Sequence, residues 1–96
     1  MVPGQIVGKI VAFSQQGNLV SDISADQLLQ VPRDESVVIR CDEHETNCLF
    51  DGVHNQPEAT LIARIGSSGR LELEIVGDSA KIMLGIPLGE TIVVQW

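Results

Sequence analysis

One segment of the sequence gathers residue types that bind metal ions: CDEHETNCLFDGVH, residues 41–54. Cys41, His44, Cys48 and His54 give it the spacing C-x2-H-x3-C-x5-H. Zinc needs four such ligands to converge at about 2.0–2.3 Å. The spacing does not match a familiar tight pair of knuckles, and a glycine precedes the last histidine. We therefore interpret these residues as two small buried or half-buried thiols and two loop histidines, with a small metal-binding domain as an alternative.

A second set of side chains has the types used in acyl transfer: Ser67 or Ser68, with His54 and Asp51. Hydrolases of this kind place the serine in a G-x-S-x-G turn between a strand and a helix. Neither serine has that context, because GSSG (66–69) separates two strand-like segments. GSSG also lacks the following helix and the nearby lysine of a phosphate-binding loop. We therefore expect no enzymatic activity from this chain alone and interpret 66–69 as a hairpin turn.

The pair Gly17-Asn18 is the third candidate, and it lies between two apolar segments. Both residue types tolerate positive φ, so the local pattern is typical of a turn. A Gly-Asn pair can also be part of a ligand-binding loop. The local sequence leaves both interpretations open.

The composition describes a small acidic domain with an aliphatic core. The chain has 96 residues, of which 44 % are hydrophobic and 3 % aromatic, and a net charge of −7. This charge, with lysines and arginines scattered along the chain, argues against nucleic acid and anionic membranes as partners. Two cysteines do not make a disulfide scaffold. There is no signal-like leader or long apolar run, so we expect one cytoplasmic domain over residues 1–96.

Apolar residues alternate with polar ones in short runs that Gly, Pro, Asn and Asp separate. This pattern predicts seven strands, at residues 5–13, 18–23, 36–41, 46–50, 59–65, 70–75 and 90–96. No crossover helix is long enough for a parallel sheet. The prediction is therefore an all-β fold, a small closed or nearly closed antiparallel barrel with one or two short helices. The last strand is expected to close it.

The two helices are expected at 24–31 and 78–85. Ser24 is the predicted N-cap of the first, and Asp78 or Ser79 that of the second.

In the strand at 70–75, strict alternation places Leu71, Leu73 and Ile75 on the inner face. The glutamates between them fall on the outer face. We interpret the acidic residues of this strand and of the 42–45 segment as a solvated face: Asp42, Glu43, Glu45, Glu72 and Glu74.

Four segments, in order along the chain, resemble one family. GNLVSDI (17–23) resembles the Phe-Gly-Asn-Leu-Val-Thr-Asn-Ile segment of S-adenosylmethionine hydroxide adenosyltransferases and the related halogenases. SSGRLELEI (67–75) is similar to their Ser-x-Gly-x-Leu-Glu-Ile strand, and GDSAKIMLGIPLGETIVV (77–94) to their final segment. LFDGV (49–53) more distantly resembles a Tyr-Ser-Asp-Val segment. The resemblance is confined to the C-terminal domain of that family, a small β-barrel.

In such enzymes the adenosyl ligand lies between the N-terminal domain of one subunit and the C-terminal barrel of the next, within a trimer. The resemblance implies that Asn18 hydrogen-bonds the adenine edge, where its amide would donate and accept at once. It implies that Phe50 stacks on adenine and that Ser67, followed by Ser68, lies near the methionine carboxylate. The implied ligand is S-adenosylmethionine or adenosine. The implied assembly is a homo-oligomer such as a trimer, or a complex with a larger protein.

The chain also departs from the family pattern at several positions. Gln16 replaces the Phe before Gly-Asn, and Ser14 or Phe13 replaces the upstream Asp that would hold the substrate ammonium. Asp22 replaces an Asn, and Ser68 stands where the halogenases have an Arg, so no cation is offered there to a carboxylate. The matching residues Gly17-Asn18, Ser67 and Phe50, in family order and without the catalytic domain, predict a non-catalytic adenosyl- or nucleoside-binding module, whereas the changes favour the alternative. The alternative is a structural or oligomerisation domain that has lost its ligand.

Overall fold

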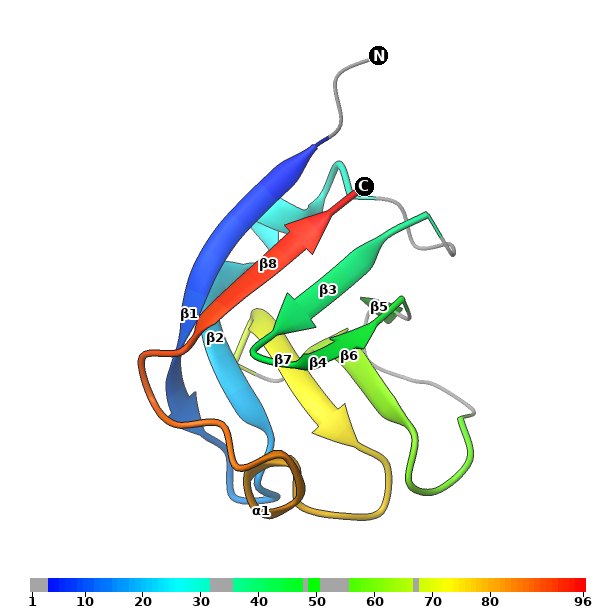
Figure 1. Ribbon diagram of the computed structural model, residues 1–96. Coiled ribbons are helices and arrows are strands. Elements are labelled where there is room, and N and C mark those ends of the chain that lie inside the picture. Colours follow the sequence, from blue (N-terminus) through cyan, green and yellow to red (C-terminus); the bar gives the residue numbers. More distant parts are fainter. Residues whose placement is uncertain (1–3, 32–35, 48, 51–55, 67) are drawn as a thin grey trace.

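The fold is a single curled sheet, which a computed structural model describes for residues 4–31, 36–47, 49–50, 56–66 and 68–96. Eight strands in the order β4-β3-β8-β1-β2-β7-β6-β5 form a half-barrel (Figure 1). One short α-helix and one 3-10 turn accompany the sheet. The prediction of a mostly β domain is confirmed, with one strand more than expected.

The chain forms its elements in the following order: β1 (Gln5–Phe13), β2 (Leu19–Ser24), η1 (Asp26–Leu28), β3 (Val38–Cys41), β4 (His44–Thr46), β5 (Leu49–Phe50), β6 (Leu61–Ile65), β7 (Arg70–Ile75), α1 (Ala80–Leu84) and β8 (Thr91–Gln95). Among the described residues no helix has the length and apolar character needed to cross a membrane.

Several details of the predicted barrel are wrong. The strand expected at 46–50 is two strands: β4, which pairs with β3, and β5, which pairs with β6. The β5–β6 pair is parallel, so the sheet is not purely antiparallel. The last strand does not close the sheet, because β8 lies inside it between β1 and β3. The strand expected at 36–41 forms only over Val38–Cys41.

One face of the sheet carries an aliphatic core. A cross-strand row of Leu19, Leu73, Ala63 and Leu49 runs from β2 to β5, and all four side chains are buried. The inward residues predicted for β7 are confirmed, since Leu71 and its two apolar neighbours at alternate positions are also buried. The core therefore follows the period-two pattern of the strands.

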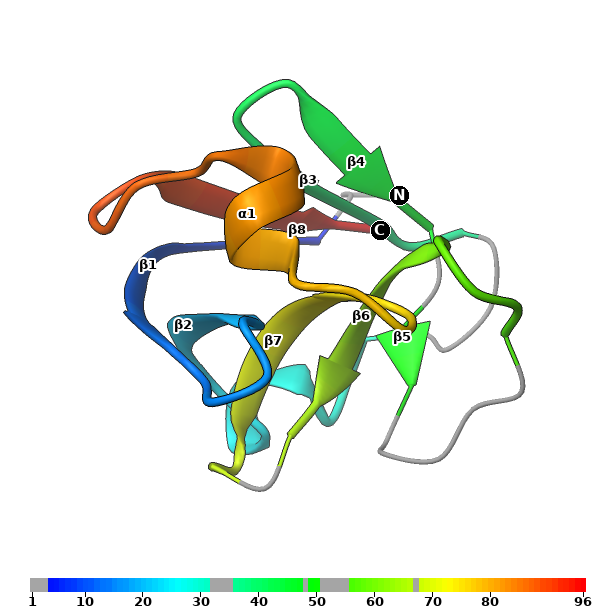
Figure 2. The same cartoon turned by 90° about the horizontal axis from the view of Figure 1, so that it is seen from below.

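The short helix α1 lies across one end of the curled sheet (Figures 1 and 2). Ser79 is its N-cap, because the Ser79 Oγ accepts a hydrogen bond from the backbone N–H of Ile82 at 3.4 Å. Gly85 ends the helix in the left-handed conformation, with φ 65°. Ala80 is fully buried and packs the helix against the core. The predicted second helix and one of its two candidate caps are thus confirmed.

The first expected helix is reduced to the single 3-10 turn η1. Ser24 and Gln27 exchange hydrogen bonds at its start, since the Ser24 N–H donates to Gln27 Oε1 at 2.9 Å and the Gln27 N–H donates to Ser24 Oγ at 3.4 Å. These bonds resemble a capping box, yet the formal cap position is Ala25. Leu28 is buried in the core, so the turn still fastens this connection to the sheet.

Gly17 shapes the hairpin between β1 and β2. It has φ 86°, and its N–H donates to Ser14 O at 2.9 Å. A Cβ at Gly17 would collide with the Ser79 side chain, and the Gly17 carbonyl accepts the Lys81 N–H at 2.8 Å. The tip of this hairpin is therefore in direct contact with the first turn of α1, and the glycine is required by both its backbone angle and its neighbour.

Candidate functional site

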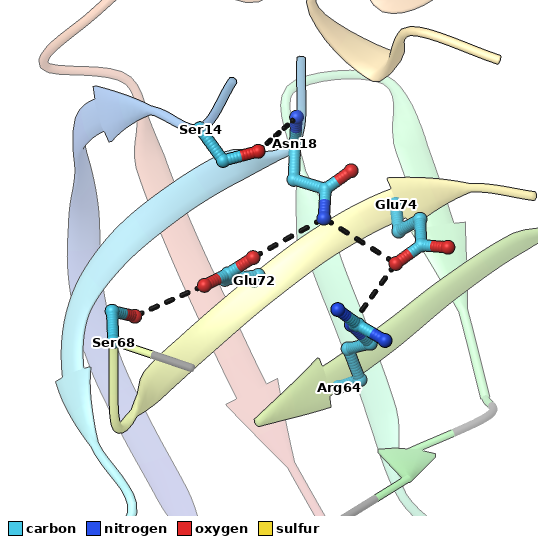
Figure 3. Close-up of polar contacts among 6 residues, drawn as sticks. All are labelled: Ser14, Asn18, Arg64, Ser68, Glu72 and Glu74. Carbon is cyan, nitrogen blue, oxygen red and sulfur yellow. Dashed lines mark hydrogen bonds and ion pairs between the residues drawn. The ribbon is translucent and has the colours of Figure 1, made fainter. Parts of the chain in front are cut away.

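Asn18 directs its side chain toward β7 and not toward its own turn. Its backbone N–H donates to Ser14 Oγ at 3.0 Å. Its side-chain Nδ2 donates to Glu72 Oε1 at 3.2 Å and to Glu74 Oε1 at 3.3 Å (Figure 3). The residue is 3 % exposed. Because Gly17 adopts the positive φ of the turn, a turn conformation alone does not explain why an asparagine occupies position 18.

Glu72 is buried in this polar cluster almost as deeply as Asn18. It is 4 % exposed, although it lies on the outer face of β7. Its Oε1 accepts from Asn18, and its Oε2 accepts from Ser68 Oγ at 3.0 Å. A Cβ on Gly66 would collide with this carboxylate, so the glutamate packs directly against the backbone of the β6–β7 hairpin. A buried carboxylate is costly unless donors compensate it, and the hydroxyl and the amide supply them here.

Glu74 connects the amide to a cation. Its Oε1 accepts from Asn18 and forms an ion pair with Arg64 Nε at 3.0 Å (Figure 3). The side chains of Arg64 and Glu74 are 29 % and 17 % exposed, so the pair is half-buried. Pairs in such surroundings are screened less by salt than fully exposed ones.

The strand register explains why these side chains meet. Glu72 lies opposite Val20 on β2 and opposite Arg64 on β6. Phe50 on β5 lies opposite Arg64 in turn, so all four occupy one cross-strand row on the outer face. Asn18 precedes Val20 by two residues and therefore shares this face. Residues separated by up to 56 positions in the sequence form one site in this way.

A cavity of about 340 Å³ opens beside the amide, and Asn18 forms part of its wall. The described residues that line it come from the β1–β2 turn, β6 and the end of β7: Gln16, Asn18, Arg64, Glu74, Ile75, Gly77 and Asp78. One lining side chain is cationic and two are anionic. The cavity is polar, carries an excess of negative charge and lies next to a fixed amide.

The structure brings together two of the four residues that the resemblance assigned to ligand binding. Glu72 connects Asn18 and Ser68, although Ser68 Oγ donates to the carboxylate and not to open space. Phe50 is half-buried and lies on the same cross-strand row as Glu72. Its strand β5 is three strands from β2, so Phe50 is about 14 Å from β2 across the sheet. Phe50 is not among the described residues of the cavity wall. Ser67 lies outside the described residues.

The interpretation of the acidic residues as a solvated face is wrong for β7. Glu72 is buried and Glu74 is half-buried, whereas Asp42, Glu43 and Glu45 are exposed as expected. Alternation assigns a residue to a face of the sheet but does not say whether that face is covered. One sequence signal could have revealed the site. An arginine falls on the outer face of one expected strand, and two glutamates fall on the outer face of the next.

The other candidate constellations stay largely untested. Cys41 is buried at the end of β3 and lies opposite His44 on β4. Burial raises the pKa of its thiol to about 11, and the Glu90 and Asp42 carboxylates add to the rise. Cys48 and His54 lie outside the described residues. Among the residues that are described, no three His, Cys, Asp or Glu side chains form a cluster suited to a metal ion.

The proposed acyl-transfer set and the GSSG turn are placed only in part. Asp51 and His54 lie outside the described residues. Gly66 and Gly69 do close a hairpin between β6 and β7, because the Gly69 N–H donates to Gly66 O at 3.0 Å and the Gly66 N–H donates to Arg70 O at 3.1 Å. The prediction of a hairpin turn is confirmed.

Comparison with solved structures identifies the fold. The chain is similar to an uncharacterized conserved protein from Thermotoga maritima, with a TM-score of 0.74 and 22 % identity, over 94 % of this chain and 35 % of that one. It is also similar to a conserved hypothetical protein from Thermus thermophilus, with a TM-score of 0.71 and 23 % identity, over 92 % and 34 %. The chain thus spans about a third of the length of both proteins.

A comparison with curated proteins finds no significant match. A family model, in contrast, matches residues 8–93. That range extends from β1 to β8 and includes Asn18, Arg64, Glu72 and Glu74. The model describes the C-terminal domain of SAM hydroxide adenosyltransferases, so the sequence resemblance is confirmed. The chain belongs to the family of SAM hydroxide adenosyltransferase C-terminal domains.

Proposed function

We propose that this chain is a non-catalytic module that binds an adenosyl or nucleoside ligand and completes a site on a partner protein. The observation that carries the proposal is the Asn18 amide, which two carboxylates hold in the wall of a polar cavity. Ligand sites of this kind are concave and have a few polar groups in fixed positions. Family membership supports an adenosyl group as the ligand.

The charge of the site favours S-adenosylmethionine or adenosine over a phosphorylated nucleotide. Glu74 and Asp78 outnumber Arg64 in the cavity wall, and the whole chain carries a net charge of −7. Such a field repels phosphate and attracts a positive group such as a sulfonium. The cytoplasmic address expected from the sequence fits this ligand and stays a prediction.

The size of the cavity supports a shared site. Its volume of about 340 Å³ is near the lower end of the range of about 300–1,000 Å³ for small-molecule sites. It suits part of a nucleoside ligand better than a whole S-adenosylmethionine molecule. The chain also spans about a third of the length of the two similar solved proteins. The partner we propose is a second copy, as in a trimer, or a larger protein that supplies the rest of the site.

Calorimetric titration of the folded chain with S-adenosylmethionine, adenosine, AMP and methionine tests this proposal. We expect heat for the first two, weaker binding of AMP because of its phosphate, and none for methionine. Asn18→Ala should abolish the signal. Asn47→Ala is the matched control, because Asn47 is an exposed asparagine on a different hollow, beside Glu45 and Thr46. Flat titrations for every ligand would remove ligand binding by the chain alone.

A second candidate is a docking or oligomerisation domain that no longer binds a ligand. The observation in its favour is a set of large apolar side chains that are exposed on the monomer: Val7, Val11, Leu29, Ile82, Met83 and Leu88. Such exposure is typical of interaction surfaces where the side chains are contiguous. Light scattering during size-exclusion chromatography, together with the titrations, distinguishes the candidates. A stable trimer without ligand binding supports this one, and adenosine binding by a monomer or a trimer supports the first.

A further inference from the structure

The direction of the Asn18 amide follows from its two neighbours. A primary amide has two N–H donors on nitrogen and an acceptor oxygen, while a carboxylate only accepts. Glu72 and Glu74 each approach the amide with a carboxylate oxygen, at 3.2 and 3.3 Å. Turning the amide over would place its oxygen against two carboxylate oxygens. The nitrogen must therefore face β7, and the orientation drawn in Figure 3 is the one that the chemistry permits.

The same two bonds use the whole donor capacity of the amide. Nδ2 carries two hydrogens, and each has a carboxylate acceptor. The oxygen points away from both glutamates (Figure 3). Within the described part of the chain, the hydrogen bonds of this side chain all involve nitrogen and none involves Oδ1. The amide can offer a ligand an acceptor and has no N–H left to donate.

We infer that Glu72 and Glu74 are specificity-determining positioning residues that hold Asn18 as an acceptor-only group, so the ligand must present an N–H donor to it. A base with an exocyclic amino group, such as adenine, meets this requirement. A purine that offers only ring nitrogens as acceptors does not. This inference rests on the proposed function, since it concerns the ligand of the same cavity. It also differs from the donate-and-accept contact that the family resemblance implied.

Glu74 is the residue whose change should alter this preference. It lines the cavity and is half-buried, whereas Glu72 is buried between Asn18 and Ser68. Glu74→Ala would leave one amide N–H on Glu72 and release the other toward the cavity. The site would then offer a donor as well as an acceptor. A merely structural role for Glu74 would weaken the binding of every ligand, whereas a freed N–H should strengthen the binding of a purine that offers only ring nitrogens.

The experiment compares adenosine with purine riboside, which lacks only the 6-amino group, by calorimetry on the wild-type chain. Loss of a hydrogen bond to a fixed buried acceptor predicts about tenfold weaker binding of purine riboside. Purine riboside should bind Glu74→Ala several-fold more tightly than it binds the wild-type chain, because the freed N–H can bond a ring nitrogen. Glu45→Ala is the matched control, since Glu45 also pairs with an arginine, Arg40, at 3.1 Å, but is exposed and lies on β4.

The outcomes separate this inference from the proposed function. A tenfold wild-type preference for adenosine, with a gain in purine riboside affinity in Glu74→Ala and no such gain in Glu45→Ala, supports the inference. Equal affinity of the wild-type chain for both nucleosides, or no gain in purine riboside affinity in a folded Glu74→Ala variant, overturns it while the nucleoside-binding function stands. Binding of neither nucleoside overturns the proposed function and this inference with it. The wild-type comparison decides the matter even where a variant does not fold.

Discussion

The side-chain amide of Asn18 donates to the buried carboxylate of Glu72 across 54 residues of sequence. We expect this hydrogen bond to couple Asn18 and Glu72 energetically, so that the effects of removing the two side chains are not additive. Removing Asn18 leaves a buried carboxylate with one donor fewer, which should cost about 1–3 kcal/mol of unfolding free energy. Urea unfolding of Asn18→Ala, Glu72→Ala and the double variant gives the coupling energy, which we expect to be about 1–2 kcal/mol.

Asn47→Ala serves as the control, because Asn47 is exposed and should change the unfolding free energy by about 0.5 kcal/mol or less. Strict additivity of Asn18→Ala and Glu72→Ala would contradict the coupling.

The contact of Gly17 with α1 predicts a steric cost on top of a conformational one. Gly17→Ala would place a Cβ against Ser79 at φ 86°, so we expect a loss of about 2–3 kcal/mol. Gly89→Ala isolates the conformational part, because Gly89 has φ 88° and no heavy atom within 4 Å of an added Cβ. That variant should lose about 1 kcal/mol. Chemical denaturation measures both, and equal losses would show that the contact with Ser79 costs nothing.

The buried thiol of Cys41 predicts a loss of stability at alkaline pH. Burial, helped by the Glu90 and Asp42 carboxylates, raises its pKa from 9.0 to about 11. Above pH 9 the thiol therefore ionises in the unfolded chain before it does in the folded one. The unfolded state then binds fewer protons, so stability is full below pH 9 and falls as the pH rises toward 11.

The fall should amount to about 2 kcal/mol over that interval. Urea unfolding at intervals between pH 8 and pH 11, with Cys41→Ala as the control, checks it. The control should have lower overall stability and a flatter slope over this interval, since other groups also titrate there. Identical slopes would contradict the assignment to Cys41.

The thiol should also be protected from reagents. Cys41 is 1 % exposed, so in a Cys48→Ser background iodoacetamide should react with it only through opening of the structure. Mass spectrometry would follow the single modification, which should speed up in urea. Modification as fast as that of free cysteine would mean that the β3 terminus is open in solution.

The sequence was informative where one local pattern determines the outcome. The alternation in β7 correctly placed Leu71, Leu73 and Ile75 on the core, because period-two geometry depends on the strand alone. The sequence also predicted Ser79 and Gly85 as the ends of a helix, because helix capping depends on residues within a few positions of each other.

The sequence was misleading where the burial of a residue or the extent of a strand depends on pairing between distant strands. Glu72 was expected to be solvated, yet its burial depends on β2 and β6 as neighbours and on the backbone at Gly66. The division of the 46–50 segment, and the parallel pairing of Phe50 with Arg64, likewise depend on which strand lies alongside. The resemblance identified Asn18 correctly as a notable residue but gave no indication of the two glutamates that fix its amide.

The position of β8 between β1 and β3 has a consequence for how the molecule acquires its structure. Gln5 pairs with Gln95, and Val38 pairs with Gln95 on the other side. The backbone ladder that links β3 to β1 is complete only once β8 has been made, so the sheet cannot assemble in the order of synthesis. We therefore expect folding on the millisecond-to-second timescale typical of high contact order. Until β8 arrives, β1 and β3 each have an unpaired edge, and this is when the chain is most exposed to aggregation.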